Sequence, residues 1–385
     1  MKFKFTKDDT NAVKGVAILM MLFHHLFLAP ERYAGFDVGF SPLSESSVVF
    51  IAQFFKICVA IFVFLSGYGI TVSMKKLKSG DNLASRKQVA KRYFSLMSGF
   101  WFVYIVCFIT ALIFDKKILS CYAYSGDVAA LDNTFNTVFY ALVDFMGLAK
   151  LFGTPTMIGT WWYMSLAVII VVAVPLMYKL YEKFGTVALL VVTMVLCGVF
   201  TLENPDMFRW LFTLSLGIVF ADKDLLARLK NFRFINIRII DYFVKLIIYT
   251  AVLIFCFYAR DWADWIVSYF RDGIVPVVVI MWLYTILFAI KPLYVVLKYL
   301  GQHSMNIFLS HTLLRGYLLK SFIYSKGNFL VIFGMLIILS LGFAVVIDLL
   351  ETFTGYKKFT QFVTAKIMGS GKKVEKETEK ETAKV

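Results

Sequence analysis

The chain has 385 residues, of which 60% are hydrophobic and only 17% are charged, and its formal net charge is +15. A soluble globular protein is nearer half apolar and a quarter charged, so this composition excludes a soluble domain of this size. The long apolar runs indicate membrane-spanning helices rather than a β-barrel, and the basic excess is typical of cytoplasmic loops rather than of nucleic-acid binding. We therefore expect an all-α, polytopic integral membrane protein.

About ten transmembrane helices are predicted within residues 1–350. The basic loops 75–92 and 222–245 should be cytoplasmic, and an even number of spans then places both termini on the cytoplasmic side of the cell membrane. Segment 134–152 is expected to be an interfacial or re-entrant helix on the outer side. The predicted spans are 12–29, 48–74, 93–114, 157–178, 186–202, 207–221, 246–259, 272–290, 303–323 and 329–350.

The last part of the chain, residues 351–385, is polar and charged and is expected to be a cytoplasmic tail. Its end, GSGKKVEKETEKETAKV over residues 369–385, lacks aromatic and large apolar side chains apart from valine. Such a segment cannot bury enough apolar surface to fold, so we predict disorder or a frayed helix there.

The first span, KGVAILMMLFHHLF over residues 14–27, carries a lysine and a histidine on one helix face. Lys14 and His25 are eleven positions apart, so they differ by about 20° around an α-helix and by about 16 Å along it. Imidazole titrates near neutral pH and suits proton abstraction, while the lysine could hold the distant end of a long ligand. The alternatives are a lysine that anchors the span and a histidine that links helices. His24 lies about 100° away around the helix.

Two further spans contain polar or aromatic candidates. Ser66 and Gly67 allow close approach of another helix, and packing is the favoured interpretation for this pair. Lys56 lies within its predicted span and needs a partner, a water-filled cavity or a long reach to the surface. Trp162 and Tyr163 begin a span at the outer interface, where an aromatic belt explains them, and a platform for stacking substrate is the alternative.

The segment LGQHSMNIFLSHTLL, residues 300–314, carries the remaining two histidines. Ser304 and His311 share a helix face, whereas His303 and His311 are about 80° apart. Each could line the same cavity as His25, but the spacing does not show it. No carboxylate or cysteine joins the histidines at ligand spacing, so we expect no metal site.

These segments together resemble membrane-bound acyltransferase family 3, whose members O-acylate surface polysaccharides. The family has a basic residue and a histidine in its first span, a Ser-Gly-aromatic motif in its second, a Trp-containing motif later, and a Leu-Gly…Ser…His motif near the end. The corresponding residues here are, in chain order, Lys14 with His25, Ser66-Gly67-Tyr68, Trp162-Tyr163-Met164, and Leu300-Gly301 with Ser304, Ile307-Phe308-Leu309 and His311. Two of these positions depart from the usual pattern, with Lys14 in place of arginine and Phe308 in place of tyrosine.

The resemblance implies an acyltransferase that takes an acyl group, most simply acetyl, from cytoplasmic acyl-CoA and delivers it to a hydroxyl of a surface or lipid-linked glycan. Acyl-CoA is then a co-substrate rather than a permanently bound cofactor. It implies that His25 is the catalytic base or acyl relay and that Lys14 positions the CoA. His24, Ser66, Trp162, Tyr163, Ser304 and His311 are substrate-binding candidates, with His24 and His303 expected to have supporting roles.

The residues and the resemblance leave two points open: how the acyl group reaches its acceptor, and whether the protein is a transporter instead. Longer relatives carry a fused esterase-like domain that we do not expect here, so the protein should present the acyl group to its acceptor within the membrane or pass it to a separate extracytoplasmic transferase. The rival interpretation is a transporter or exporter of a glycan or lipid precursor, which needs a path through the protein but no acyl-CoA site.

Overall fold

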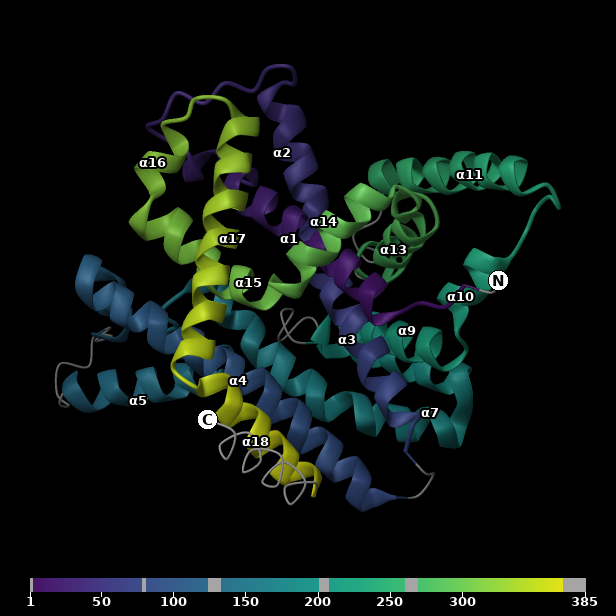
Figure 1. The fold of residues 1–385 in the computed structure, drawn as a ribbon, viewed down its shortest axis with the longest axis horizontal. Coiled ribbons are helices and arrows are strands. Elements are labelled where there is room, and N and C mark those ends of the chain that lie inside the picture. The colour runs from purple at the N-terminus through teal and green to yellow at the C-terminus, as the bar shows by residue number, and fades with distance from the viewer. Residues whose placement is uncertain (1–2, 78–80, 124–132, 201–207, 260–268, 370–385) are drawn as a thin grey trace, which may run out of the picture. The chain divides into compact units, whose positions relative to one another are not determined.

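The computed structural model describes residues 3–77, 81–123, 133–200, 208–259 and 269–369, and every regular element in these ranges is helical (Figure 1). The predicted disorder of 369–385 therefore falls almost entirely outside the described residues. Two compact units are present: residues 1–76, 173–304 and 324–337 form the first, and residues 77–172, 305–323 and 338–385 form the second.

The helices of the first unit are α1 (Lys7–Phe27), α2 (Glu45–Phe54), α3 (Cys58–Met74), α9 (Leu211–Asp222), α10 (Leu225–Asn231), α11 (Arg238–Ala259), α13 (Val275–Thr285) and α14 (Lys291–Gln302). The second unit contains α4 (Asn82–Phe114), α5 (Asn133–Phe145), α6 (Ala149–Phe152) and α18 (Tyr356–Met368). Four helices have residues in both units: α7 (Trp162–Phe200), α15 (Ser304–Leu313), α16 (Lys320–Tyr324) and α17 (Phe329–Phe353).

Within the described residues, seven helices are long and apolar enough to cross a membrane. They are Lys7–Phe27, Glu45–Met74, Asn82–Phe114, Gly159–Val199, Arg238–Ala259, Phe270–Ala289 and Phe329–Phe353. The all-α membrane class is thus confirmed, whereas the number of about ten crossings stays a prediction.

Three irregularities account for the difference between the seven long helices and the ten predicted spans. Gly185 has φ 82° inside α7, between the predicted fourth and fifth spans, so the chain turns there through a conformation that favours glycine. Helix α9 is apolar but has only 12 residues. The predicted ninth span, 303–323, is interrupted after α15 by a π-helical turn at Leu314–Leu318.

Helix α1 begins with a capping box, because Thr6 and Asp9 exchange side-chain and backbone hydrogen bonds. Its N-terminal half packs directly against α14, which lies beside it in Figure 1. A Cβ atom on Gly301 would lie 1.7 Å from the carbonyl oxygen of Asn11, and one on Gly15 would lie 2.0 Å from that of Leu297. The two backbones therefore touch, which only glycine allows, and this contact fixes the helix that carries Lys14 and His25.

A second close contact joins α3 to α9. A Cβ atom on Gly67 would lie 2.7 Å from the Leu214 carbonyl oxygen, and one on Gly217 would lie 2.4 Å from the Phe64 carbonyl oxygen. The predicted role of the Ser66-Gly67 pair in helix packing is therefore confirmed for Gly67.

The second unit is built around α4, whose buried side chains include Met97 and Phe100. Helix α18 packs along α4, where the Tyr356 hydroxyl donates to the Ser98 carbonyl at 2.9 Å. Helices α5 and α6 occupy the segment 134–152 that was predicted to be interfacial, and neither is among the seven membrane-length helices.

Candidate functional site

Helix α1 runs without a break from Lys7 to Phe27, so Lys14, His24 and His25 lie on one helix as predicted. His24 is buried, and its Nδ1 lies 2.8 Å from the carbonyl oxygen of Ala52 on α2. A carbonyl can only accept, so Nδ1 carries the proton and donates it. His24 thus links α1 to α2 and has the geometry of a supporting residue.

The side chain of His25 is only half-buried, in contrast to that of its neighbour. The two imidazole rings meet edge to face, with centroids 5.2 Å apart. The hydrogen bond to Ala52 holds the His24 ring in place, and the edge-to-face contact with that ring orients the His25 ring. A half-exposed imidazole held on one side retains access to a substrate hydroxyl, which a fully buried ring would lack.

Lys14 is also half-buried, three turns before His25 on the same helix. It directly precedes Gly15, whose backbone meets Leu297 of α14, so the base of the lysine side chain is fixed by that contact. Two groups of different chemistry are therefore spaced along a single rigid helix. This arrangement suits an extended ligand with an anionic end and a reactive end.

The polar candidates of the second predicted span separate into two environments. The Ser66 hydroxyl donates to the Phe62 carbonyl at 2.8 Å, so it is engaged within its own helix. Lys56 is exposed and lies in a 3-10 turn, Phe55–Ile57, which interrupts the span between α2 and α3. The break places the lysine at the surface of the first unit.

A second histidine lies in the other unit, where it is fully buried. His311 Nδ1 donates to the Phe308 carbonyl at 2.8 Å, so Nε2 accepts, and the Thr312 hydroxyl lies 3.1 Å from it. Thr160 in turn donates to Thr312 at 3.3 Å. The bonds run in one direction, from Thr160 through Thr312 and His311 to the Phe308 carbonyl. Thr160 and Thr312 were not identified from the sequence.

Two residues of the aromatic motif at the start of α7, Trp161 and Tyr163, contact α15, the helix that carries His311. Trp162 and Tyr163 are half-buried, and Tyr163 packs on Phe308 with centroids 5.5 Å apart. Their buried neighbour Trp161 donates from Nε1 to the Leu309 carbonyl at 2.8 Å. The WWY motif therefore binds α15 within this unit, which accounts for Trp161 as a structural residue.

Ser304 is buried at the first position of α15, directly after His303. His303 ends α14 and packs edge-on against Tyr299, with ring centroids 4.7 Å apart. Ser304 and His311 share α15 but belong to different units.

The sequence also missed a buried carboxyl cluster in the second unit. Asp144 Oδ2 accepts from the Tyr122 hydroxyl at 2.5 Å and from the Met157 backbone amide at 2.8 Å, and the Tyr104 hydroxyl lies 3.0 Å from that of Tyr122. Burial raises the pKa of Asp144 above its ordinary value, although the hydrogen bonds oppose this. Asp144 and Tyr122 are 22 positions apart, so no local motif marks them.

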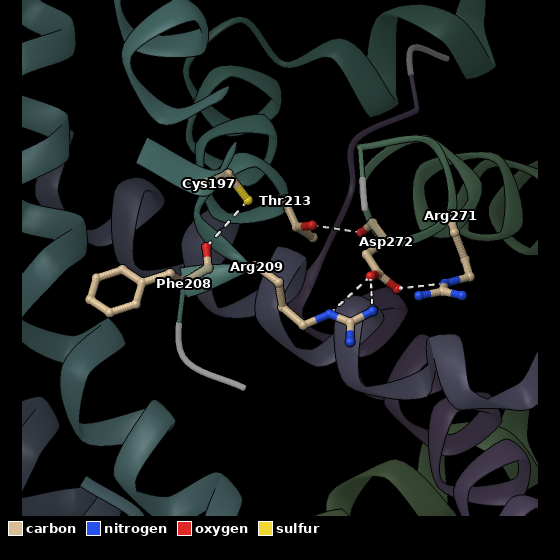
Figure 2. Close-up of polar contacts among 6 residues, drawn as sticks. All are labelled: Cys197, Phe208, Arg209, Thr213, Arg271 and Asp272. Atoms are coloured by element: carbon tan, nitrogen blue, oxygen red, sulfur yellow. Dashed lines mark hydrogen bonds and ion pairs between the residues drawn. The ribbon is translucent and has the colours of Figure 1, made fainter. Parts of the chain in front are cut away.

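A second buried carboxylate, Asp272, lies in the π-helical turn Phe270–Ile274 of the first unit (Figure 2). Arg209 binds it through Nε, at 3.1 Å, and through Nη2, and Arg271 Nε lies 3.5 Å from its other oxygen. Thr213 donates to its backbone carbonyl at 2.6 Å. Two guanidinium groups thus flank one carboxylate, and Arg209 and Thr213 join the start of α9 to the turn before α13.

Among the described residues, no three His, Cys, Asp or Glu side chains are grouped to hold a metal ion. These helices and sites define a multi-pass helical membrane protein. A family model for the acyltransferase domain of acyltransferase family 3 matches residues 8–349, nearly the whole chain. The chain therefore belongs to this family and is a membrane acyltransferase, as the sequence motifs predicted. No curated protein and no solved structure matches the chain.

Proposed function

We propose that the protein transfers an acyl group, most simply acetyl, from cytoplasmic acyl-CoA to a hydroxyl of a surface or lipid-linked glycan. The observation that carries the proposal is the family match over residues 8–349 together with a half-buried imidazole on α1. The proposed orientation has both termini on the cytoplasmic side of the cell membrane, so that Lys14 is near the cytoplasmic mouth of the site and His25 lies deeper.

In the proposed reaction, His25 accepts the proton of the acceptor hydroxyl as its oxygen attacks the thioester carbonyl. A carbon–oxygen bond forms and the carbon–sulfur bond breaks. The proton then passes from His25 to the leaving thiolate, giving the free thiol of CoA. Lys14 binds a phosphate of CoA as a point charge and lacks the bidentate geometry that an arginine would provide.

The test uses full-length protein reconstituted in vesicles with radiolabelled acetyl-CoA and a glycan extract as acceptor. Removal of a general base commonly costs 10²- to 10⁴-fold in rate, so His25→Gln should lower acetyl transfer by roughly that factor. The matched control is His303→Gln, because His303 packs on Tyr299 at a helix end. Both variants should keep the thermal unfolding midpoint of the wild type.

Two results would count against the proposal. Undiminished transfer by His25→Gln would remove His25 from the reaction. Movement of an unmodified glycan across the vesicle membrane, without release of CoA thiol, would favour a transporter instead. If acetyl is released from CoA but reaches no glycan, a separate extracytoplasmic transferase is the next component to add.

A further inference from the structure

We propose that a basic pocket beside α10 and α11 binds the phosphate headgroup of an anionic phospholipid. The cavity has a volume of about 470 Å³ and lies wholly within the first unit. Its wall carries four cationic side chains and one carboxylate, which are Lys230, Arg233, Arg238, Lys245 and Asp241. This proposal does not depend on the acyl-transfer reaction.

The single carboxylate of the pocket is already neutralised. Asp241 Oδ2 pairs with Lys245 Nζ at 2.9 Å, and its Oδ1 accepts from the Phe234 backbone amide at 2.8 Å. Arg233 and Arg238 are exposed, and within the described residues no carboxylate lies at ion-pair distance from either guanidinium. The pocket therefore presents uncompensated positive charge to an incoming anion.

Lys230 provides a cation that is held in place before any ligand arrives. Its Nζ donates to the Tyr284 carbonyl at 2.7 Å and lies over the rings of Tyr284 and Phe3, 3.7 and 4.8 Å from their centroids. Phe3 is itself fixed, because its backbone amide and carbonyl both bond to the Asn231 side chain at 2.8 Å. A cation positioned in this way loses little conformational freedom when an anion binds.

A buried hydroxyl on the same wall points independently to a ligand. Thr285 is 8% exposed and lines the pocket, and its Oγ1 has no hydrogen-bond partner in the described part of the chain. A buried polar atom without a partner is costly, at about 1–3 kcal/mol, so such atoms usually face a water or a bound group. A phosphate oxygen is an acceptor that this hydroxyl can satisfy.

The apolar surface next to the pocket identifies the anion as a lipid. Ile239 lines the pocket and is 70% exposed, and Phe243 and Ile247 continue the exposed face of α11. The helix Arg238–Ala259 is long enough to cross the membrane, and only 17% of its apolar window is buried in the protein. The acyl chains of a phospholipid can lie on this face while its headgroup enters the pocket. A nucleotide has no acyl chains that would cover the face.

The test measures thermal unfolding of detergent-solubilised full-length protein during titration with phosphatidylglycerol. The test variant is Arg233→Gln/Arg238→Gln, because both guanidinium groups are exposed and their loss should not change the midpoint without lipid. The control is Arg228→Gln, which removes an exposed cation of α10 that does not line the pocket. Phosphatidylcholine, CoA and inorganic phosphate are titrated in parallel.

Phosphatidylglycerol should raise the wild-type midpoint, and the apparent affinity of the double variant should be roughly thirtyfold weaker, which is about 1 kcal/mol for each lost cation. Arg228→Gln should respond like the wild type. Three outcomes would overturn the proposal: an equal response of the double variant, an equal stabilisation by phosphatidylcholine, or a response to CoA or phosphate that the double variant loses while phosphatidylglycerol has no effect.

Discussion

Replacement of Gly301 by alanine tests the contact that holds α1 against α14. The added Cβ would meet the Asn11 carbonyl oxygen at 1.7 Å, the Asn11 carbonyl carbon at 2.6 Å and the Gly15 amide nitrogen at 2.9 Å. All three are backbone atoms, so no side chain can rotate away. Ordinary contact needs about 3.2–3.4 Å, and the two helices must therefore separate by about 1.5 Å, which removes the close packing along their interface.

Overpacking of this kind typically costs about 1–3 kcal/mol, and a backbone clash belongs at the upper end of that range. Higher helix propensity of alanine returns about 1 kcal/mol at most. We expect Gly301→Ala to lower the thermal unfolding midpoint by several degrees and to lower acyl transfer with it, because α1 carries both Lys14 and His25.

The matched control for Gly301→Ala is Gly334→Ala in α17, where a Cβ would meet no atom within 4 Å. This variant should be neutral or slightly stabilised. Both are measured by thermal unfolding in the same detergent, followed by transfer assays in vesicles. If Gly301→Ala unfolds at the same temperature as Gly334→Ala, the backbone contact between α1 and α14 is refuted.

Three further predictions concern buried or partly buried charges. Asp272→Asn leaves Arg209 without its carboxylate and should destabilise the protein by about 3–5 kcal/mol in thermal unfolding, as for other broken buried pairs. Tyr122→Phe removes a donor to Asp144 and should cost about 1–3 kcal/mol in the same measurement. Burial lowers the pKa of Lys230 to about 8, so in lipid-free detergent its contribution makes stability rise from pH 8 to pH 10, where the unfolded chain binds more protons. Lys230→Met should abolish that rise.

The sequence predicted the elements that depend on local pattern. Helix α1 follows from an apolar run with Thr6, Asp8 and Asp9 at its start, so the common helix of Lys14 and His25 was predictable. The family motifs predicted an acyltransferase, and the comparison of residues 8–349 confirmed it.

The remaining features depend on contacts between distant segments, which local periodicity cannot assign. The sequence shows that Gly15 permits a close approach but does not show that Leu297 makes it. Arg209 and Asp272 are 63 positions apart, and in the sequence both follow polar stretches that read as ordinary surface. A charge next to an apolar span is the one signal that could have marked Asp272 for attention.

The two hydrogen bonds between Phe3 and Asn231 also have a consequence for how the chain enters the membrane. These residues are 228 positions apart, and both must lie on the same side of the bilayer for the bonds to form. An even number of crossings therefore separates them. During biosynthesis, the segment before α1 can dock only after α10 has emerged on that side. A nascent chain with one misinserted helix between them would place the two segments on opposite sides of the bilayer, and neither hydrogen bond could then form.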